Sequence, residues 1–140
     1  MKQFLLPLFI LFLLLFTGCV QKPYSKHNAK TSLDYLGVYV GTLPCSNCEG
    51  IKTSIRLMED RRYQKQLIYL GQHINNYEAS GRFRWLADRN RIMLDDGSYY
   101  FVSEGYLLAL NNKGEKITGD FSPKYRLEKF NISHIIDFEK

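Results

Sequence analysis

Short segments that alternate apolar and polar residues constrain the fold of this chain more than any other feature. Residues 51–58 and 77–88 both alternate in this way, with Ile55 and Leu57 on the apolar side of the first and Phe83 on that of the second. A period of two residues is typical of a strand with one buried and one exposed face. We therefore expect an antiparallel β protein.

Six further segments have strand character and are separated by turn residues such as Asp95-Asp96-Gly97. They are residues 36–43, 62–70, 90–95, 98–103, 106–111 and 124–130. No segment longer than ten residues keeps a helical period. About eight short strands joined by tight turns predict an all-β meander that curls into a barrel or a sandwich.

The first eighteen residues have the layout of a signal peptide. Lys2 is followed by an apolar run of 13 residues from Phe4 to Phe16, broken only by Pro7. This length lies within the ~7–15 residues of a secretory signal and below the ~20 that span a bilayer. Residues 16–19, Phe-Thr-Gly-Cys, resemble the bacterial lipobox, although Leu is commonest where Phe16 stands.

The lipobox resemblance implies that residues 1–18 are removed and that Cys19 is lipidated. Several acyl chains on one residue give stable anchoring, whereas a single chain is marginal. An Asp after the cysteine commonly retains such lipoproteins in the inner membrane, and here Val20 follows it. The implied location is the outer membrane, with the protein facing the periplasm. The alternatives to a lipoprotein are ordinary cleavage of the signal peptide and a retained membrane helix.

The mature chain divides into a tether and one domain. Residues 19–33 are polar beyond the anchor, lack periodicity and contain no acidic residue, which predicts a flexible tether. Residues 34–140 then form a single β domain. The net charge of the whole sequence is +5, but basic and acidic residues are interspersed, as in residues 59–62 (Glu-Asp-Arg-Arg). This pattern indicates a solvated surface, and no nucleic-acid partner is expected.

Cys45 and Cys48 are the one group of residues in the sequence that points to metal or redox chemistry. They make a C-x-x-C motif between the first two expected strands, and this spacing lets both sulfurs reach one metal ion or each other. Soft thiolates favour Cu(I) and Zn(II). Met58, His73 and Glu49 are the candidates for additional ligands.

Redox chemistry and a structural role remain open beside metal binding. An exported C-x-x-C can cycle between dithiol and disulfide in the oxidising periplasm, and it can also be a permanent disulfide that pins the loop. Thioredoxin-type catalysis requires a cysteine at a helix N-terminus in a βαβ context, which the sequence does not predict. We therefore expect no catalytic residues and no enzymatic activity.

The aromatic residues of the expected strands have two possible roles. They could line a cavity for a small apolar or lipid ligand, or they could form the core and cross-strand pairs. The set comprises Tyr39, Tyr63, Tyr69, Phe83, Trp85, Tyr99, Phe101 and Tyr106.

The segment around the cysteines resembles the N-terminal domain of the NlpE family of outer-membrane lipoproteins. The resemblance rests on residues 37–55, GVYVGTLPCSNCEGIKTSI, with a G-x-L-P-C-x-x-C-x-G-I-x-T core, and continues in the Tyr-Leu-Gly segment at 69–71 and the strand from Gly81 to Trp85. It spans about residues 35–130.

The NlpE resemblance implies a small lipocalin-like β-barrel and a role in copper resistance or envelope-stress sensing. It also implies a sensor-kinase pathway as a partner in some members. Longer members carry a second, OB-like domain with another cysteine pair, and this chain ends before such a domain. Functions that depend on that domain are therefore not expected of residues 34–140.

Overall fold

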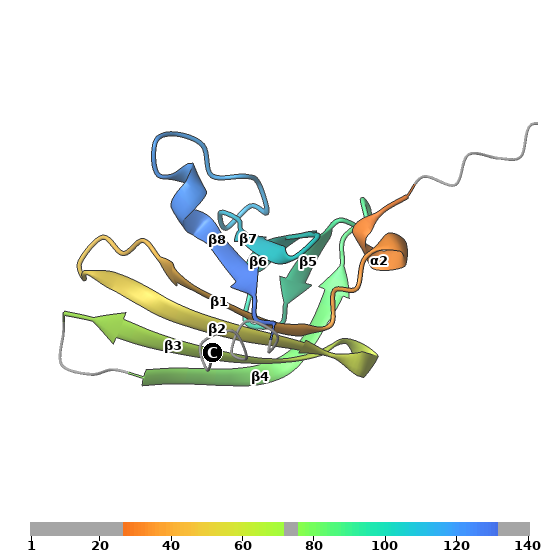
Figure 1. Cartoon of the computed structure of the whole chain (residues 1–140), viewed down its shortest axis with the longest axis horizontal. Helices are drawn as coiled ribbons and strands as arrows, with labels where there is room; N and C mark the ends of the chain where they lie inside the picture. The colour runs from red at the N-terminus through yellow and green to blue at the C-terminus, as the bar shows by residue number, and fades with distance from the viewer. Residues whose placement is uncertain (1–26, 72–75, 132–140) are drawn as a thin grey trace, which may run out of the picture.

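The computed structural model describes residues 27–71 and 76–131, which form a closed antiparallel barrel (Figure 1). Each strand pairs with the next along the chain, and the last pairs with the first. The strands are β1 (Gly37–Leu43), β2 (Gly50–Met58), β3 (Arg62–Leu70), β4 (Asn76–Trp85), β5 (Arg91–Leu94), β6 (Tyr99–Ser103), β7 (Tyr106–Ala109) and β8 (Arg126–Lys129). The all-β fold and its eight-stranded meander barrel are thus confirmed.

The two ends of the barrel differ. One end carries the short helix α2 (Ala29–Ser32), the β4–β5 turn and the β2–β3 turn with the 3-10 segment η2 (Glu59–Arg61) (Figure 1). We call it the α2 end. The other end carries the β1–β2 loop and the β7–β8 connection with the 3-10 segment η3 (Ser122–Tyr125). We call it the loop end.

Inward-facing side chains of the strands fill the centre of the barrel. The buried apolar residues are Ala29, Tyr39, Ile55, Leu57, Tyr63, Phe83, Ile92, Leu94, Tyr100, Val102, Leu107, Ala109 and Leu127. Burial, with a smaller effect of Asp34, raises the pKa of Tyr39 to about 12. Others of the expected aromatic set lie outside this buried cluster: Lys116 Nζ lies 4.6 Å from the Phe101 ring centroid, and the Arg126 guanidinium 3.7 Å from that of Tyr106. Of the aromatic set, Tyr39, Tyr63 and Phe83 are thus buried in the core, and Trp85 packs against it, whereas Phe101 and Tyr106 make cation–π contacts outside it.

Helix α2 packs against one end of the barrel. The Ala29 side chain is buried, and its backbone N–H donates to Asn90 Oδ1 at 2.8 Å. The Lys30 N–H donates to the Arg89 carbonyl at 3.1 Å, and Leu33 packs on the core. These contacts fall within the expected tether, so packed structure begins before Asp34. The β4–β5 turn, at residues 89 and 90, supplies the two hydrogen bonds.

A polar cluster lies against the core at the β5–β6 turn. Lys65 is only 8% exposed and forms an ion pair with Asp96. The buried Tyr63 hydroxyl donates to Asp95 Oδ1 at 2.6 Å, and this bond lowers the pKa of Asp95. Gly81 leaves room for the Asp95 carboxylate, because a Cβ there would collide with its oxygens. The cluster ties β3 and β4 to a turn that is distant in sequence.

The β2–β3 turn contains two residues in the left-handed region. Asp60 and Arg61 have φ of 58° and 59°, between Met58 and Arg62 of the paired strands. When both central residues of a turn are left-handed, the twist of the turn matches that of the two strands. The second of these positions, here that of Arg61, is the one where glycine is preferred. Arg61 is therefore a strained choice for this position.

We predict that Arg61→Gly raises the free energy of unfolding by about 1 kcal/mol, because glycine adopts the left-handed conformation without a Cβ penalty. Urea unfolding followed by the fluorescence of Trp85, the one tryptophan of the sequence, measures the change. Arg61→Ala is the control, because it removes the same charge and keeps the Cβ. An equal gain in both variants would assign the effect to charge and contradict the prediction.

Candidate functional site

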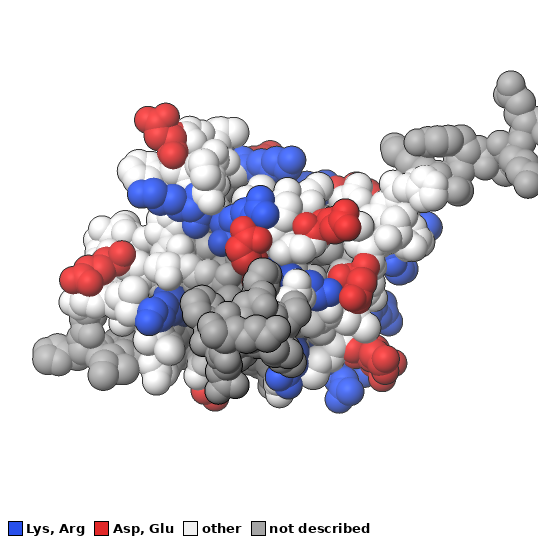
Figure 2. All heavy atoms as spheres, viewed as in Figure 1, with Lys and Arg blue, Asp and Glu red and all other residues white. Residues whose placement is uncertain are grey.

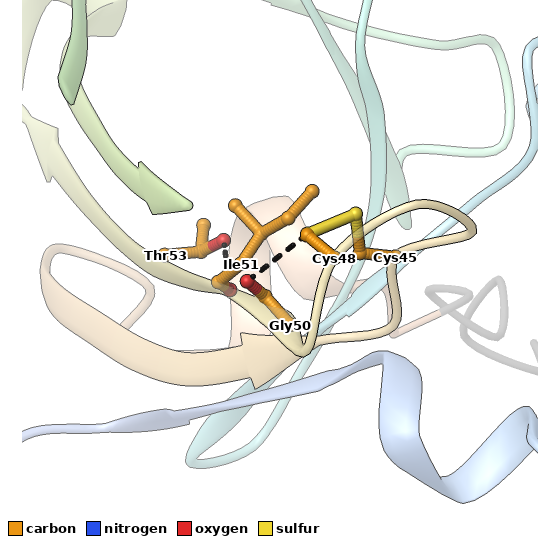
Figure 3. The surroundings of a disulfide bond; sticks show 5 residues. All are labelled: Cys45, Cys48, Gly50, Ile51 and Thr53. Carbon is orange, nitrogen blue, oxygen red and sulfur yellow. Dashed lines mark hydrogen bonds between the residues drawn. A yellow bond between two sulfur atoms is a disulfide. The ribbon is translucent and has the colours of Figure 1, made fainter. Parts of the chain in front are cut away.

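The loop that contains Cys45 and Cys48 joins β1 to β2 at the loop end of the barrel. A disulfide links the two cysteines, whose Cα atoms are 5.3 Å apart (Figure 3). Both residues are half-buried, and residues 44–49 have no helical structure. The pair thus lies in an irregular connection between antiparallel strands, a setting unlike the helix N-terminus of thioredoxin-type catalysts.

The C-terminal side of this loop is held against β3. The Glu49 N–H donates to the Leu70 carbonyl at 3.1 Å, and the Glu49 side chain covers Gly71. Gly71 has a φ of +77°, and a Cβ there would lie 2.7 Å from Glu49 Cγ. A Cβ at Gly50 would lie equally close, 2.7 Å, to Thr42 Cγ2. The glycines at 50 and 71 therefore permit a close approach that fixes the end of the loop.

Cys48 also contacts the first residue of β2. Its Sγ lies 3.3 Å from the Gly50 carbonyl oxygen, as drawn in Figure 3, beside the hydrogen bond from the Thr53 hydroxyl to the Ile51 carbonyl. In the disulfide this sulfur has no proton to donate, whereas a reduced Cys48 thiol could donate to that carbonyl. The redox state of the pair therefore determines an interaction at the start of a barrel strand.

A hollow of about 480 Å³ separates this loop from η3 and the start of β8. Pro44 and Cys45 line one side, and Phe121, Pro123 and Lys124 line the other. The Phe121 side chain is 60% exposed, with Lys124 Nζ 4.9 Å from its ring centroid. No sequence pattern indicated this wall in advance; its only signal is the apolar Phe121 and Pro123 within a stretch of polar residues. Glu49, Arg126 and Glu128 also line the hollow, so the disulfide is bordered by a solvent-accessible surface that combines the apolar Phe121 and Pro123 with charged side chains.

Among the predicted ligands, the structure brings together Cys45 and Cys48, whereas the Glu49 side chain lies against Gly71. Met58 ends β2, about 26 Å from its first residue at ~3.3 Å per residue, so it lies at the opposite end of the barrel. His73 and the predicted lipidation site Cys19 lie outside the described residues. Over residues 27–71 and 76–131, no group of three or more His, Cys, Asp or Glu side chains could hold a metal ion. The soft donors of this loop are therefore two sulfurs, which suit Cu(I) or Zn(II) when they are reduced.

The part of the chain that the structure describes contains no helix long and apolar enough to cross a bilayer. The predicted signal peptide, residues 1–18, falls outside it.

Comparison with known proteins gives consistent matches. The model of the family described as the NlpE N-terminal domain matches residues 39–120. Lipoprotein NlpE of Escherichia coli K12 is 32% identical over 92 residues, which are 63% of this chain and 38% of the relative. The chain thus spans well under half of that relative.

Two crystal structures also resemble the barrel. A candidate lipoprotein from Shewanella oneidensis has a TM-score of 0.72 and 39% identity, covering 75% of this chain and 97% of that one. The Cpx pathway activator NlpE from Escherichia coli has a TM-score of 0.52 and 29% identity, covering 61% of this chain and 46% of that one.

Proposed function

Because the chain belongs to the NlpE N-terminal domain family, we propose that it is an envelope-stress lipoprotein whose Cys45–Cys48 loop senses copper or redox state. The observation that carries the proposal is the position of the pair. The two sulfurs lie within bonding distance in a solvent-accessible loop, and one of them contacts the first residue of β2. A change at sulfur can therefore reach both the barrel and the surface beside it.

The switch has two chemical states. Thiol–disulfide exchange with a dithiol protein transfers two electrons and two protons to the Cys45–Cys48 disulfide, so the reductant becomes a disulfide and both cysteines become thiols. Binding of Cu(I) to the reduced pair displaces the thiol protons, because the thiolate is the ligand. Copper binding and oxidation then compete for the same two sulfurs.

The envelope supplies the setting for this switch. In the proposal, Cys19 carries the lipid anchor in the outer membrane and the barrel faces the periplasm. The similar Escherichia coli protein is named as an activator of the Cpx pathway, so a partner in an envelope sensor-kinase pathway is proposed for this chain as well. The apolar wall of Phe121 and Pro123 beside the disulfide is accessible to such a partner.

Titration of the reduced full chain with Cu(I) against a competing chelator tests the copper function. We expect the wild-type chain to take up Cu(I) and the double variant Cys45→Ser with Cys48→Ser to lose nearly all of this affinity, because serine offers no soft donor. Met58→Leu is the matched control, since it removes a sulfur at the opposite end of the barrel. Equal affinity in the wild type and the double variant would contradict the proposal.

A second candidate function follows from the disulfide itself. If the bond is permanent, it staples the rim of the barrel, and the protein is a binding module for a small apolar or lipid ligand. Tyr39, Tyr63 and Phe83 pack in the barrel centre, which leaves less room there for a ligand. Mass spectrometry of lipid extracts from the purified chain tests this candidate, which predicts a bound molecule whatever the state of the cysteines.

A further inference from the structure

The surface at the α2 end is rich in arginine. The outward-facing positions of β2, β3 and β4 and the adjoining turn supply these residues, which we call the arginine surface: Arg56, Arg61, Arg62, Arg82 and Arg84. In the view of Figure 2, Lys and Arg side chains follow the rim of the molecule from α2 to the β2–β3 turn, with acidic side chains among them. The acidic residues of this turn are Glu59 and Asp60.

The five arginines form no ion pair within the part of the chain that the structure describes, although Asp60 and Asp95 lie beside them. Arg62 and Arg82 are directly opposite each other in the β3–β4 register. Like charges in directly opposed positions destabilise a sheet unless something neutralises them. The ion pairs of the described residues involve Lys65, Arg91, Arg126 and Lys129, and none involves a member of the arginine surface.

Three arginines of this surface line a shallow hollow that is open to a ligand. Arg61, Arg62 and Arg82 line it together with Asp60, and its volume is about 490 Å³. A guanidinium group presents donors in a fork that matches the oxygens of a phosphate. The residue types and their convergence therefore fit phosphate-bearing anions.

The connection to the predicted anchor leaves the barrel at this same end. Hydrogen bonds from Ala29 to Asn90 and from Lys30 to Arg89 fix α2 on the β4–β5 turn. Nine residues lie between Cys19 and Ala29, which makes ten residue steps along the chain. Even a fully extended chain of this length spans at most about 35 Å. A lipid on Cys19 therefore keeps Ala29 within that distance of the bilayer, and Ala29 lies at the same end of the barrel as the arginine surface.

We propose that the arginine surface docks the barrel on the phosphate groups of anionic phospholipids in the membrane that holds the anchor. The inference rests on the lipid anchor of the proposed function and adds a second, electrostatic attachment. Two signals hold a protein at a membrane in a defined orientation more firmly than one. Docking through the α2 end directs the Cys45–Cys48 loop away from the bilayer, about the length of β2 farther into the periplasm.

Energy transfer tests the orientation in the full lipidated chain. Trp85, at the α2 end of β4, is the donor, and a dansyl group on a lipid headgroup is the acceptor. The chain is reconstituted in vesicles of phosphatidylcholine alone and in vesicles with added phosphatidylglycerol. We expect stronger transfer with phosphatidylglycerol, and we expect added salt to abolish the difference.

The triple variant Arg61→Gln, Arg62→Gln and Arg82→Gln should reduce transfer in phosphatidylglycerol vesicles to the level seen in phosphatidylcholine. Each basic residue near an anionic surface contributes roughly fivefold to the binding equilibrium, so the ratio of docked to undocked chains should fall about 100-fold. The matched control is Lys52→Gln, Lys113→Gln and Lys124→Gln, which removes equal charge at the loop end and should leave transfer unchanged.

Flotation of the vesicles separates the possible failures. A chain that floats with both vesicle types, yet transfers energy equally in both or keeps wild-type transfer in the arginine variant, would overturn the docking proposal and leave the anchor intact. A chain that floats with neither vesicle type would overturn the anchor and the docking together.

Discussion

Replacing Asp96 with alanine is expected to lower the free energy of unfolding by about 3–5 kcal/mol, a large fraction of the stability of a domain of this size. The Lys65 side chain is 7% exposed and that of Asp96 is 15% exposed. Asp96→Ala leaves the Lys65 ammonium buried, with Ser98 Oγ at 3.1 Å as its remaining hydrogen-bond partner. A buried charge without its counterion is among the costliest defects in a protein interior.

Urea unfolding followed by Trp85 fluorescence measures this loss of stability. Two further variants test whether the loss comes from the buried ion pair. Glu128→Ala breaks the exposed pair with Arg126 and should cost less than about 1 kcal/mol. Lys65→Met combined with Asp96→Ala removes both charges and should recover much of the stability. If the double variant is as unstable as Asp96→Ala, the loss comes from packing at the turn and the ion-pair account is wrong.

The same pair gives the barrel a dependence on acid. Burial alone would raise the pKa of Asp96, but the hydrogen bonds from Lys65 and Ser98 outweigh this effect and leave the pKa below its usual range. The ionised carboxylate therefore favours the folded state at any pH above the unfolded pKa of about 3.9. This contribution should decline as the pH falls through 4 toward the lower folded pKa, and a thermal melt of Asp96→Ala should lack that part of the decline.

The proposed copper function predicts that loss of both loop cysteines abolishes the response of the envelope-stress pathway to copper. Cells that carry Cys45→Ser with Cys48→Ser should respond as weakly as cells without the protein, because neither Cu(I) binding nor disulfide exchange is available. Closing a ring this short stabilises a chain by about 2 kcal/mol or less in the entropic model, so the variant should still fold. A transcriptional reporter of the pathway measures the response.

Ser46→Ala is the matched control for this experiment, since it alters an exposed residue between the two cysteines and keeps both sulfurs. It should retain the full response to copper. A full response in the cysteine double variant would show that the pair is dispensable for signalling and would favour the stapled binding module.

The period of two residues was sufficient to predict an antiparallel β meander, because one face of nearly every strand is buried. It left a barrel and a sandwich open, and the NlpE resemblance implied the barrel. All eight expected segments contain a strand, and β3 has the expected bounds. The same alternation places Lys65 between Tyr63 and Leu67 on the inward face. The burial of Lys65 therefore follows from the pattern. Its pairing with Asp96 does not, because closure of the barrel brings together two residues that are 31 positions apart.

Other features depend on contacts that no local pattern reveals. Residues 29–32 have no amphipathic period, and their helix is held by Asn90 and Arg89 from a distant turn. The expected strand 77–88 ends at Trp85, because Asp88 instead accepts hydrogen bonds from the backbone N–H groups of Asn90 and Arg91 in the turn.

The cysteine site was predictable in position but not in state. The C-x-x-C spacing allowed the sulfurs to reach each other or one metal ion, and the structure joins them in a disulfide. Whether the pair is a switch depends on the reduction potential of the bond against that of its compartment, a quantity that residue spacing does not determine. The separation of Met58 from the pair likewise became evident only once β2 was seen to run the length of the barrel.

In the proposed function, Cys45 and Cys48 exchange between disulfide and dithiol in the envelope. Counting alkylated thiols by mass spectrometry on the chain trapped in intact membranes, with and without copper or a reductant, tests it most directly. The account predicts that both states are present and that the dithiol fraction changes with treatment. A disulfide in every molecule under all conditions would contradict it.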